Sequence, residues 1–251
     1  MQNVAITLSK EYKKLQTDYR GKTLAYYYYQ DENPKETLLL MSECFAYFEN
    51  VHGEYPYATY ALAQTELCLG GEAYSAFSWV DCHLTQEEKA REIALQTARQ
   101  WWGMGIGVNR VENAWQDLGL SAYSAICFFE EHEKYGVTRE IEVQNALKEY
   151  RSYYDVYGSV LGRTDTAMRR HLKAFVNGYE FQCLEVDKAV IMLDTLRKSV
   201  GDKQFFLGLK RYYKENVGKM AIPENLVGAF ERVGVDASGF FESFLNGKAI
   251  L

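Results

Sequence analysis

The hydrophobic pattern of the chain changes at Thr85, and this change constrains the fold more than any other feature of the sequence. Ahead of Thr85, short segments rich in Tyr, Thr, Ala and Val alternate with Gly and Pro, which is typical of strands and turns. After it, apolar residues recur at spacings of three and four, which is typical of amphipathic helices. A small sheet followed by many helices predicts an α+β fold, with the sheet at the N-terminal side packed on a mainly helical C-terminal part.

Four segments ahead of this change are expected to form strands, and one helix lies between the second and the third. The helix begins at Asn33-Pro34 and carries Leu38, Met41 and Phe45 at helical spacing. The expected strands cover residues 4–9, 22–30, 57–67 and 70–81.

The helix that starts at Thr85 has the clearest boundary signal. Thr85 is a suitable N-cap, and Glu88 follows three residues later, which predicts a capping box. Ile93, Ala94 and Trp101 lie on the side of this helix that we expect to be buried. Further helices are expected within residues 113–136, 138–158, 180–200, 202–216 and 222–247.

Composition excludes two classes of function. The net charge is −6, and there is no basic stripe of the kind that nucleic-acid binding needs. The two basic clusters, at residues 10–14 and 209–216, are expected to be solvated faces of helices. No apolar run approaches the roughly 20 residues of a membrane span, and the first residues lack the apolar core of a signal peptide. These patterns predict neither a nucleic-acid partner nor a membrane span within this chain, and they leave the compartment unknown.

Neither the cysteines nor the histidines have the spacing of a metal or disulfide framework. No C-x-x-C pair occurs, so we expect no disulfide framework and no structural zinc site. No two histidines lie at a ligand spacing, and each is interpreted as a surface or cap residue. The residues concerned are Cys44, Cys68, Cys82, Cys127, Cys183, His52, His83, His132 and His171.

Five segments, in this order along the chain, resemble the catalytic domain of the membrane alanyl aminopeptidase family, the gluzincin zinc metallopeptidases with a thermolysin-like fold. They are "FENVHGEYPY", "GGEAYSAFSWVD", "ALQTARQWWG", "NAWQDLGLSAYS" and "VDKAVIMLDTLRKSVGDKQFFLGLKRYY". The resemblance implies a small mixed sheet and a peptidase-like fold over residues 22–251. It also implies that residues 1–21 are the end, or a remnant, of an upstream β-domain.

The resemblance further implies where a zinc ion would be held. In this fold two His residues one helical turn apart and a Glu on the following helix bind the metal. The matching positions are occupied by Leu95, Arg99 and Leu118. Leu offers no lone pair, and Arg stays protonated and cannot ligate a cation. Zinc is the cofactor expected for the family, but these residues do not support it, and we expect no cofactor.

The catalytic positions of the family are also changed. The resemblance places the general base at Gln96, the acid that grips the substrate's free amine at Ala73, and the tyrosine that steadies the oxyanion at Val186. Gln takes no proton at neutral pH, and neither Ala nor Val offers a polar group. No catalytic residue of the family is therefore retained, and the sequence favours a protein that is not an enzyme.

Arg99 would place a positive charge near the vacant zinc position. A buried charge needs a partner, and Asp117, Glu112 and Glu92 are the candidates that the sequence offers. The alternative is that Arg99 extends to solvent along its aliphatic stem. The sequence leaves these two interpretations open.

Three functions remain open at this stage. The favoured one is a non-catalytic, aminopeptidase-like domain that binds a peptide or protein partner, or serves as a scaffold. The candidate peptide groove is formed by the edge-strand segment and Arg99, because an extended peptide can pair with a strand edge. One alternative is an active zinc aminopeptidase with a different ligand set, and another is a structural module of a larger, possibly membrane-associated protein. The groove candidates are Gly70, Gly71, Glu72, Ala73, Tyr74 and Arg99.

Overall fold

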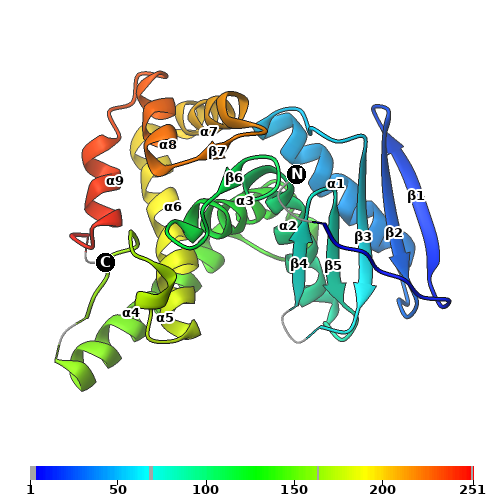
Figure 1. The fold of residues 1–251 in the computed structure, drawn as a ribbon, viewed down its shortest axis with the longest axis horizontal. Helices are drawn as coiled ribbons and strands as arrows, with labels where there is room; N and C mark the ends of the chain where they lie inside the picture. Colours follow the sequence, from blue (N-terminus) through cyan, green and yellow to red (C-terminus); the bar gives the residue numbers. More distant parts are fainter. Residues whose placement is uncertain (1–3, 68–69, 163, 250) are drawn as a thin grey trace.

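The computed structural model describes residues 4–67, 70–162, 164–249 and 251. Five strands form one sheet at the N-terminal side (Figure 1), and they are β1 (Lys13–Tyr19), β2 (Lys22–Tyr28), β3 (Thr59–Thr65), β4 (Gly71–Tyr74) and β5 (Phe77–Asp81). Their order across the sheet is β1-β2-β3-β5-β4. The central strands β2, β3 and β5 are parallel, and the edge strands β1 and β4 are antiparallel to their neighbours. The sheet is therefore mixed.

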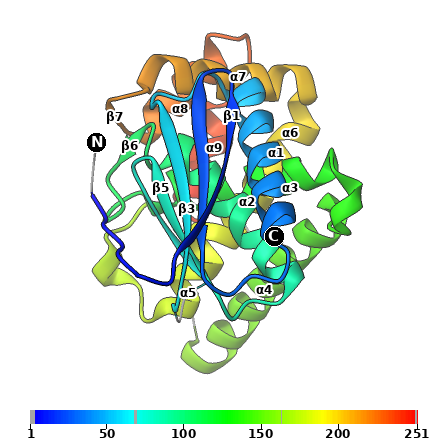
Figure 2. The same cartoon turned by 90° about the vertical axis from the view of Figure 1, so that its right-hand side faces the viewer.

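Two long helices cover one face of this sheet (Figure 2). Helix α1 (Pro34–His52) connects β2 to the parallel strand β3, and helix α2 (Gln86–Trp102) follows β5. Helix α1 contacts β1 and β2, whereas α2 contacts β4 and β5. Because β2, β3 and β5 run in one direction, their carboxyl ends meet at the same edge of the sheet.

The rest of the chain is mainly helical. Helix α3 (Leu118–Glu130) packs against α2 and α6 (Lys188–Val200), and helix α4 (Arg139–Leu161) also packs against α6. Helix α7 (Asp202–Asn216) packs against α8 (Pro223–Glu231). A two-stranded parallel sheet of β6 (Gly107–Val108) and β7 (Met220–Ala221) links the loop after α2 to the loop after α7. Within the described residues, no helix is both long enough and apolar enough to cross a bilayer. The structure also describes α5 (Gly178–Gln182) and α9 (Ser238–Leu245).

Aromatic side chains fill the core between the sheet and α2. The ring of Phe45 on α1 lies edge-on to Tyr55 and to Trp101, with centroid distances of 4.9 and 5.4 Å. The indole nitrogen of Trp101 donates a hydrogen bond to the Gly53 carbonyl at 2.9 Å. Such edge-on pairs add to the free energy of burying each ring, by about 0.5–1.5 kcal/mol. This cluster fixes the position of α2, on which the candidate site depends.

Two expectations for the N-terminal segment were wrong. Residues 4–9 form no strand, and the basic cluster at residues 10–14 is not a helix, because β1 begins within it at Lys13. Apolar side chains in residues 4–9 are largely exposed, Leu8 to 96%, so forming a strand there would bury little. Lys13–Tyr19 instead pairs with β2 through a two-residue turn at Arg20 and Gly21, whose φ values of 51° and 79° suit a hairpin.

The segment 70–81 was expected to be one strand and is a hairpin. The turn between β4 and β5 includes Ala76, whose φ is 61°, and Tyr74 pairs with Phe77. The side chain of Gln100 on α2 holds this turn. Its amide nitrogen donates to the Tyr74 carbonyl at 3.0 Å, and its oxygen accepts from the Ala76 backbone nitrogen at 3.1 Å. A partner on a distant helix thus favours the turn, which explains why the local pattern did not predict it.

The other expected strands and helices overlap the predicted segments, so the α+β expectation is confirmed, whereas the short strands β6 and β7 were not predicted. The capping box is present, because Thr85 Oγ1 accepts from the Glu88 backbone and Glu88 accepts from the Thr85 backbone. Strand β1 belongs to the same sheet as the strands of residues 22–251. Whether residues 1–21 derive from an upstream domain stays a prediction, and residues 1–3 lie outside the described part.

Close packing of α3 on α6 generates a stability prediction. A Cβ atom at Gly119 would overlap the Cβ atom of Ala189. We expect Gly119→Ala to lower the free energy of unfolding by about 1–3 kcal/mol, because this interface has no room for a methyl group. Denaturant unfolding of the Gly119→Ala protein, with Ala189→Gly added in a second variant, measures the effect.

The second substitution should restore much of the loss by removing the methyl group that is overlapped. Gly239→Ala is the matched control, because a Cβ there meets no atom within 4 Å. A loss for Gly119→Ala no greater than that of the control would contradict the prediction.

Candidate functional site

The positions that the resemblance assigns to metal ligands lie on two adjoining helices. Leu95 and Arg99 are one turn apart on α2, and Leu118 is the first residue of α3. Leu95 and Leu118 are half-buried, whereas the Arg99 residue is only 4% exposed. Arg99 contacts Asp117, the residue directly before α3, so α2 and the start of α3 meet at these positions.

The guanidinium of Arg99 lies between two carboxylates. Its Nη2 is 2.9 Å from Glu72 Oε1 and 3.4 Å from Asp117 Oδ2. A second arginine, Arg110, reaches the same acids, with its Nε 2.6 Å from Asp117 Oδ2 and its Nη1 3.8 Å from Glu72 Oε1. These four side chains form what we term the Arg99 network. Two positive and two negative charges balance within it, so no unpaired charge is buried.

The expectation that Arg99 could extend to solvent was wrong. Burial alone would lower the pKa of its guanidinium, but the charges of Asp117 and Glu72 outweigh burial and raise it, so Arg99 stays positive. Among the partners that the sequence offered, Asp117 is the one in direct contact. Glu112 accepts instead from Asn109, and Glu92 from the neighbouring Gln96, as described next.

Gln96, at the expected position of the general base, bridges Arg99 and Glu92. Its Nε2 donates to Glu92 Oε1 at 2.6 Å, and its Oε1 accepts from Arg99 Nη1 at 3.1 Å. Burial raises the pKa of Glu92. The Gln96 amide can donate a hydrogen bond to Glu92 and accept one from Arg99, whereas an ionised carboxylate at this position could only accept. Gln96 is therefore satisfied by its neighbours and offers no base.

The residues at the three ligand positions do not fit zinc. Leu95 and Leu118 have no donor atom, and Arg99 is a cation whose nitrogens already donate to Glu72, Asp117 and Gln96. A dication placed beside this guanidinium would be repelled.

The candidate groove residues 70–74 comprise Gly70 and the whole of the edge strand β4. Ala73 is fully buried, and it contributes no polar side chain to the edge. The side chain of Glu72 is 41% exposed and binds Arg99. Within the described residues, β4 pairs with β5 alone, so its other edge has no strand partner. Cys68, two residues before this segment, lies outside the described residues.

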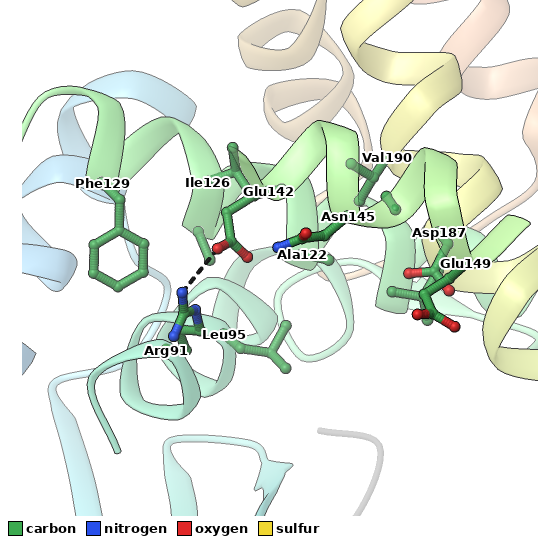
Figure 3. A pocket seen from close by; sticks show the side chains of 13 residues that line it. Arg91, Leu95, Ala122, Ile126, Phe129, Glu142, Asn145, Glu149, Asp187 and Val190 are labelled. Atoms are coloured by element: carbon green, nitrogen blue, oxygen red, sulfur yellow. Dashed lines mark hydrogen bonds and ion pairs between the residues drawn. The ribbon is translucent and has the colours of Figure 1, made fainter. Parts of the chain in front are cut away.

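A cavity of about 230 Å³ lies between α2, α3, α4 and α6 (Figure 3). Leu95 and Val186, at two of the positions assigned by the resemblance, are part of its wall. One end carries the ion pair of Arg91 and Glu142, at 2.9 Å, and Figure 3 shows Asp187 and Glu149 together at the other end. The other lining residues are Ala122, Ala125, Ile126, Phe129, Asn145, Ala146 and Val190.

Two carboxyl groups near this cavity have raised pKa values. Burial, and then the charge of Glu149, raises the pKa of Asp187 to about 7. Burial raises the pKa of Glu185 to about 8. The Oε2 of Glu185 accepts from the Trp115 backbone at 2.8 Å, and its Oε1 has no hydrogen-bond partner. Both residues belong to a π-helical turn, Cys183–Asp187, between α5 and α6. Such turns are frequent at functional sites.

The sequence did not predict several members of this site. Arg110 lies in a loop with no pattern that would pair it with Asp117. Glu185 and Asp187 flank Val186, but their burial depends on the π-helical turn and on α3 and α4. The acids within "CLEVDKAV", an otherwise apolar helical segment, are the one signal that could have identified them.

One histidine differs from its interpretation as a surface residue. His52 ends α1 but is 1% exposed, stacks on Phe48 and lies edge-on to Trp102 at 4.5 Å. Burial lowers its pKa to about 3, so the ring is neutral and acts as a core aromatic. His171 accepts a hydrogen bond from the Lys173 backbone at the start of a 3-10 helix, which confirms it as a cap residue.

Comparison with known proteins supports the fold. No protein-family model matches the chain, and no curated protein matches it. Among solved structures, it is similar to the M1 zinc metallopeptidase of Deinococcus radiodurans, with a TM-score of 0.70 and 15% identity. A point mutant of that enzyme bound to a Tyr-Ser-Ala substrate gives a TM-score of 0.68 and 16% identity. Each match covers 96% of this chain and 53% of the other.

The chain therefore spans about half the length of the structures it matches. At this level of identity the likeness shows the fold alone. The gluzincin, thermolysin-like fold that the sequence predicts is confirmed.

The Arg99 network generates a stability prediction. We expect Arg99→Met to lower the free energy of unfolding by about 2–4 kcal/mol, near the range for breaking a buried ion pair, because Asp117 then keeps Arg110 as its single cation. Adding Asp117→Asn should recover part of the loss by removing the buried charge. Equilibrium unfolding in urea measures both variants.

Arg169→Met is the control, because Arg169 forms an ion pair with Glu224 in which both side chains are about half-exposed. The ion pair of Arg169 and Glu224 should contribute no more than about 1 kcal/mol to the free energy of unfolding. Equal losses for Arg99→Met and the control would show that the network does not stabilise the fold.

The raised pKa of Glu185 generates a prediction about pH. Its folded-state pKa, about 8, exceeds the usual value, so the folded protein holds this proton more tightly than the unfolded chain. The resulting stabilisation is complete below about pH 4 and is lost as the pH rises through 8. We expect Glu185→Gln to reduce the fall in the free energy of unfolding between about pH 6 and pH 9.

Chemical unfolding at a series of pH values gives the difference between wild type and variant. Asp187, whose pKa is also raised, lowers the free energy of unfolding in the same direction at lower pH. Because Asp187 is present in both proteins, its contribution cancels in the difference between them. Glu140→Gln, at an exposed position of α4, serves as control. A Glu185→Gln profile parallel to that of wild type would rule out the buried, protonated carboxyl.

Proposed function

We propose that this chain is a non-catalytic, peptidase-like protein that binds a peptide or protein segment. The main support is the Arg99 network, which includes a position that the resemblance assigns to a metal ligand. A metal-dependent peptidase needs the ion to lower the pKa of a water molecule and to polarise the peptide carbonyl. A guanidinium that already binds two carboxylates supplies neither function.

The cavity is the favoured binding site. Its wall is apolar where Leu95, Ile126 and Val190 line it, and its volume is about 230 Å³. An engineered apolar cavity of about 150 Å³ already admits benzene, so this one has room for a large apolar side chain. Glu149 and Asp187 at one end favour a neighbouring basic group. These features fit a peptide that has a Phe or Leu beside Lys or Arg.

The open edge of β4 supports the same function. An extended segment can add to such an edge through main-chain hydrogen bonds, whatever its side chains. With Ala73 where the family's acid grips a free amine, this edge gives little preference for a free N-terminus. We therefore include internal segments of a protein among the ligands.

An active zinc aminopeptidase and a purely structural module of a larger protein are the alternatives. The first requires ligands other than those at the expected positions, because Leu95, Arg99 and Leu118 offer none. The second is compatible with a chain that spans about half of the structures it matches. It differs from our proposal in requiring no ligand in the cavity.

A peptidase assay tests the loss of catalysis. We expect no hydrolysis of leucine or alanine p-nitroanilide by the purified chain, with or without added zinc, because no residue at the site can hold the ion. The assay measures hydrolysis and not metal content, because zinc bound at another site on the chain would not change the expected absence of hydrolysis. Hydrolysis that a chelator removes and zinc restores would contradict the proposal.

A binding experiment tests the ligand. NMR titration with the peptide acetyl-Lys-Phe-Lys-amide at pH 8, where Asp187 is mainly charged, should shift resonances of α3 and α4 around the cavity. Asn145→Trp should abolish these shifts, since this exposed residue borders the cavity and a large ring there would close it. Gln144→Trp, exposed on the same helix but outside the lining, should leave binding intact. Absence of binding, or equal binding by the two variants, would refute the assignment.

A further inference from the structure

A group of metal-ligating side chains lies apart from the Arg99 network and the cavity, at the carboxyl edge of the sheet. Strands β2, β3 and β5 are parallel, so the residues that follow them converge. Glu66 comes directly after β3, and Cys82 and His83 come directly after β5. One oxygen of Glu66, the Cys82 sulfur and a ring nitrogen of His83 all lie within 4.8 Å of one another.

Backbone hydrogen bonds hold these residues together. The Cys82 nitrogen donates to the Thr65 carbonyl at 2.9 Å, which extends the pairing of β3 and β5 and brings Cys82 beside Glu66. The His83 nitrogen donates to the side chain of Asp81 at 3.1 Å, which stabilises the turn that follows β5. The backbone that carries the three side chains is therefore fixed by the sheet.

The chemistry of the three groups is that of a zinc site. Thiolate, imidazole and carboxylate are the ligands that zinc takes in proteins, at about 2.0–2.3 Å from the ion. Neighbouring ligand atoms around a tetrahedral ion of that size are about 3–4 Å apart, so the group needs only a small contraction. Glu66 and His83 are exposed and Cys82 is half-buried, so the two outer side chains can rotate inward. We propose that Glu66, Cys82 and His83 bind one zinc ion, with water as the fourth ligand.

Tyr29 supports this assignment from the end of the neighbouring strand β2. The Tyr29 hydroxyl is hydrogen-bonded with the Cys82 side chain. A phenol hydroxyl beside the sulfur can donate to a metal-bound thiolate, as outer groups at zinc sites do. Tyr29 and Cys82 also border a cavity of about 570 Å³, through which an ion can reach the sulfur.

Zinc binding to the full chain, kept reduced without a metal-binding reductant, tests the proposal by competition with a chromophoric chelator. We expect one equivalent to bind. Cys82→Ser and His83→Ala should each weaken binding by at least the roughly 10–100-fold that loss of an outer partner costs. Cobalt in place of zinc should give the near-ultraviolet absorption of a metal–thiolate bond, and Cys82→Ser should remove it.

His171→Ala is the matched control, because His171 is also exposed and lies outside the group. Arg99→Met should leave zinc binding unchanged, which separates this site from the one discussed under the proposed function. Failure to bind one equivalent would overturn the proposal, and so would equal affinities of wild type, Cys82→Ser and His83→Ala. Neither result would bear on the absence of peptidase activity.

Discussion

The buried guanidinium of Arg99 joins three parts of the chain that are far apart in the sequence. It connects α2 to Glu72 on the edge strand and to Asp117 at the start of α3, and Arg110 completes the charge balance. Loss of either buried charge, Arg99 or Asp117, would leave the charges of the network unbalanced.

The cavity between α2, α3, α4 and α6 combines apolar walls with an acidic end. Leu95 and Val186 line it with apolar side chains, whereas Glu149 and Asp187 make one end acidic. In our proposal this concave surface binds a ligand, and binding requires neither a metal ion nor a general base.

Local signals located most elements because each depends on nearby residues. The capping box at Thr85 and Glu88 marked the start of α2, and the spacing of Leu38, Met41 and Phe45 marked α1. The hairpin of β4 and β5 was missed because Gln100, a residue of another element, holds its turn. Strand β1 was missed because an edge strand needs few apolar residues once a hairpin turn supplies its partner.

The sequence by itself determined the α+β arrangement, because the spacing of apolar residues differs between strands and helices. It also determined that Leu95, Arg99 and Leu118 offer no atom that can bind a metal ion, because side-chain chemistry does not depend on the fold. Only the tertiary structure decided that Arg99 is buried and paired, that the pKa of Glu185 is raised, and that Glu66 meets Cys82 and His83. Those properties depend on distances between residues that are remote in the chain, and on the exclusion of water from between them.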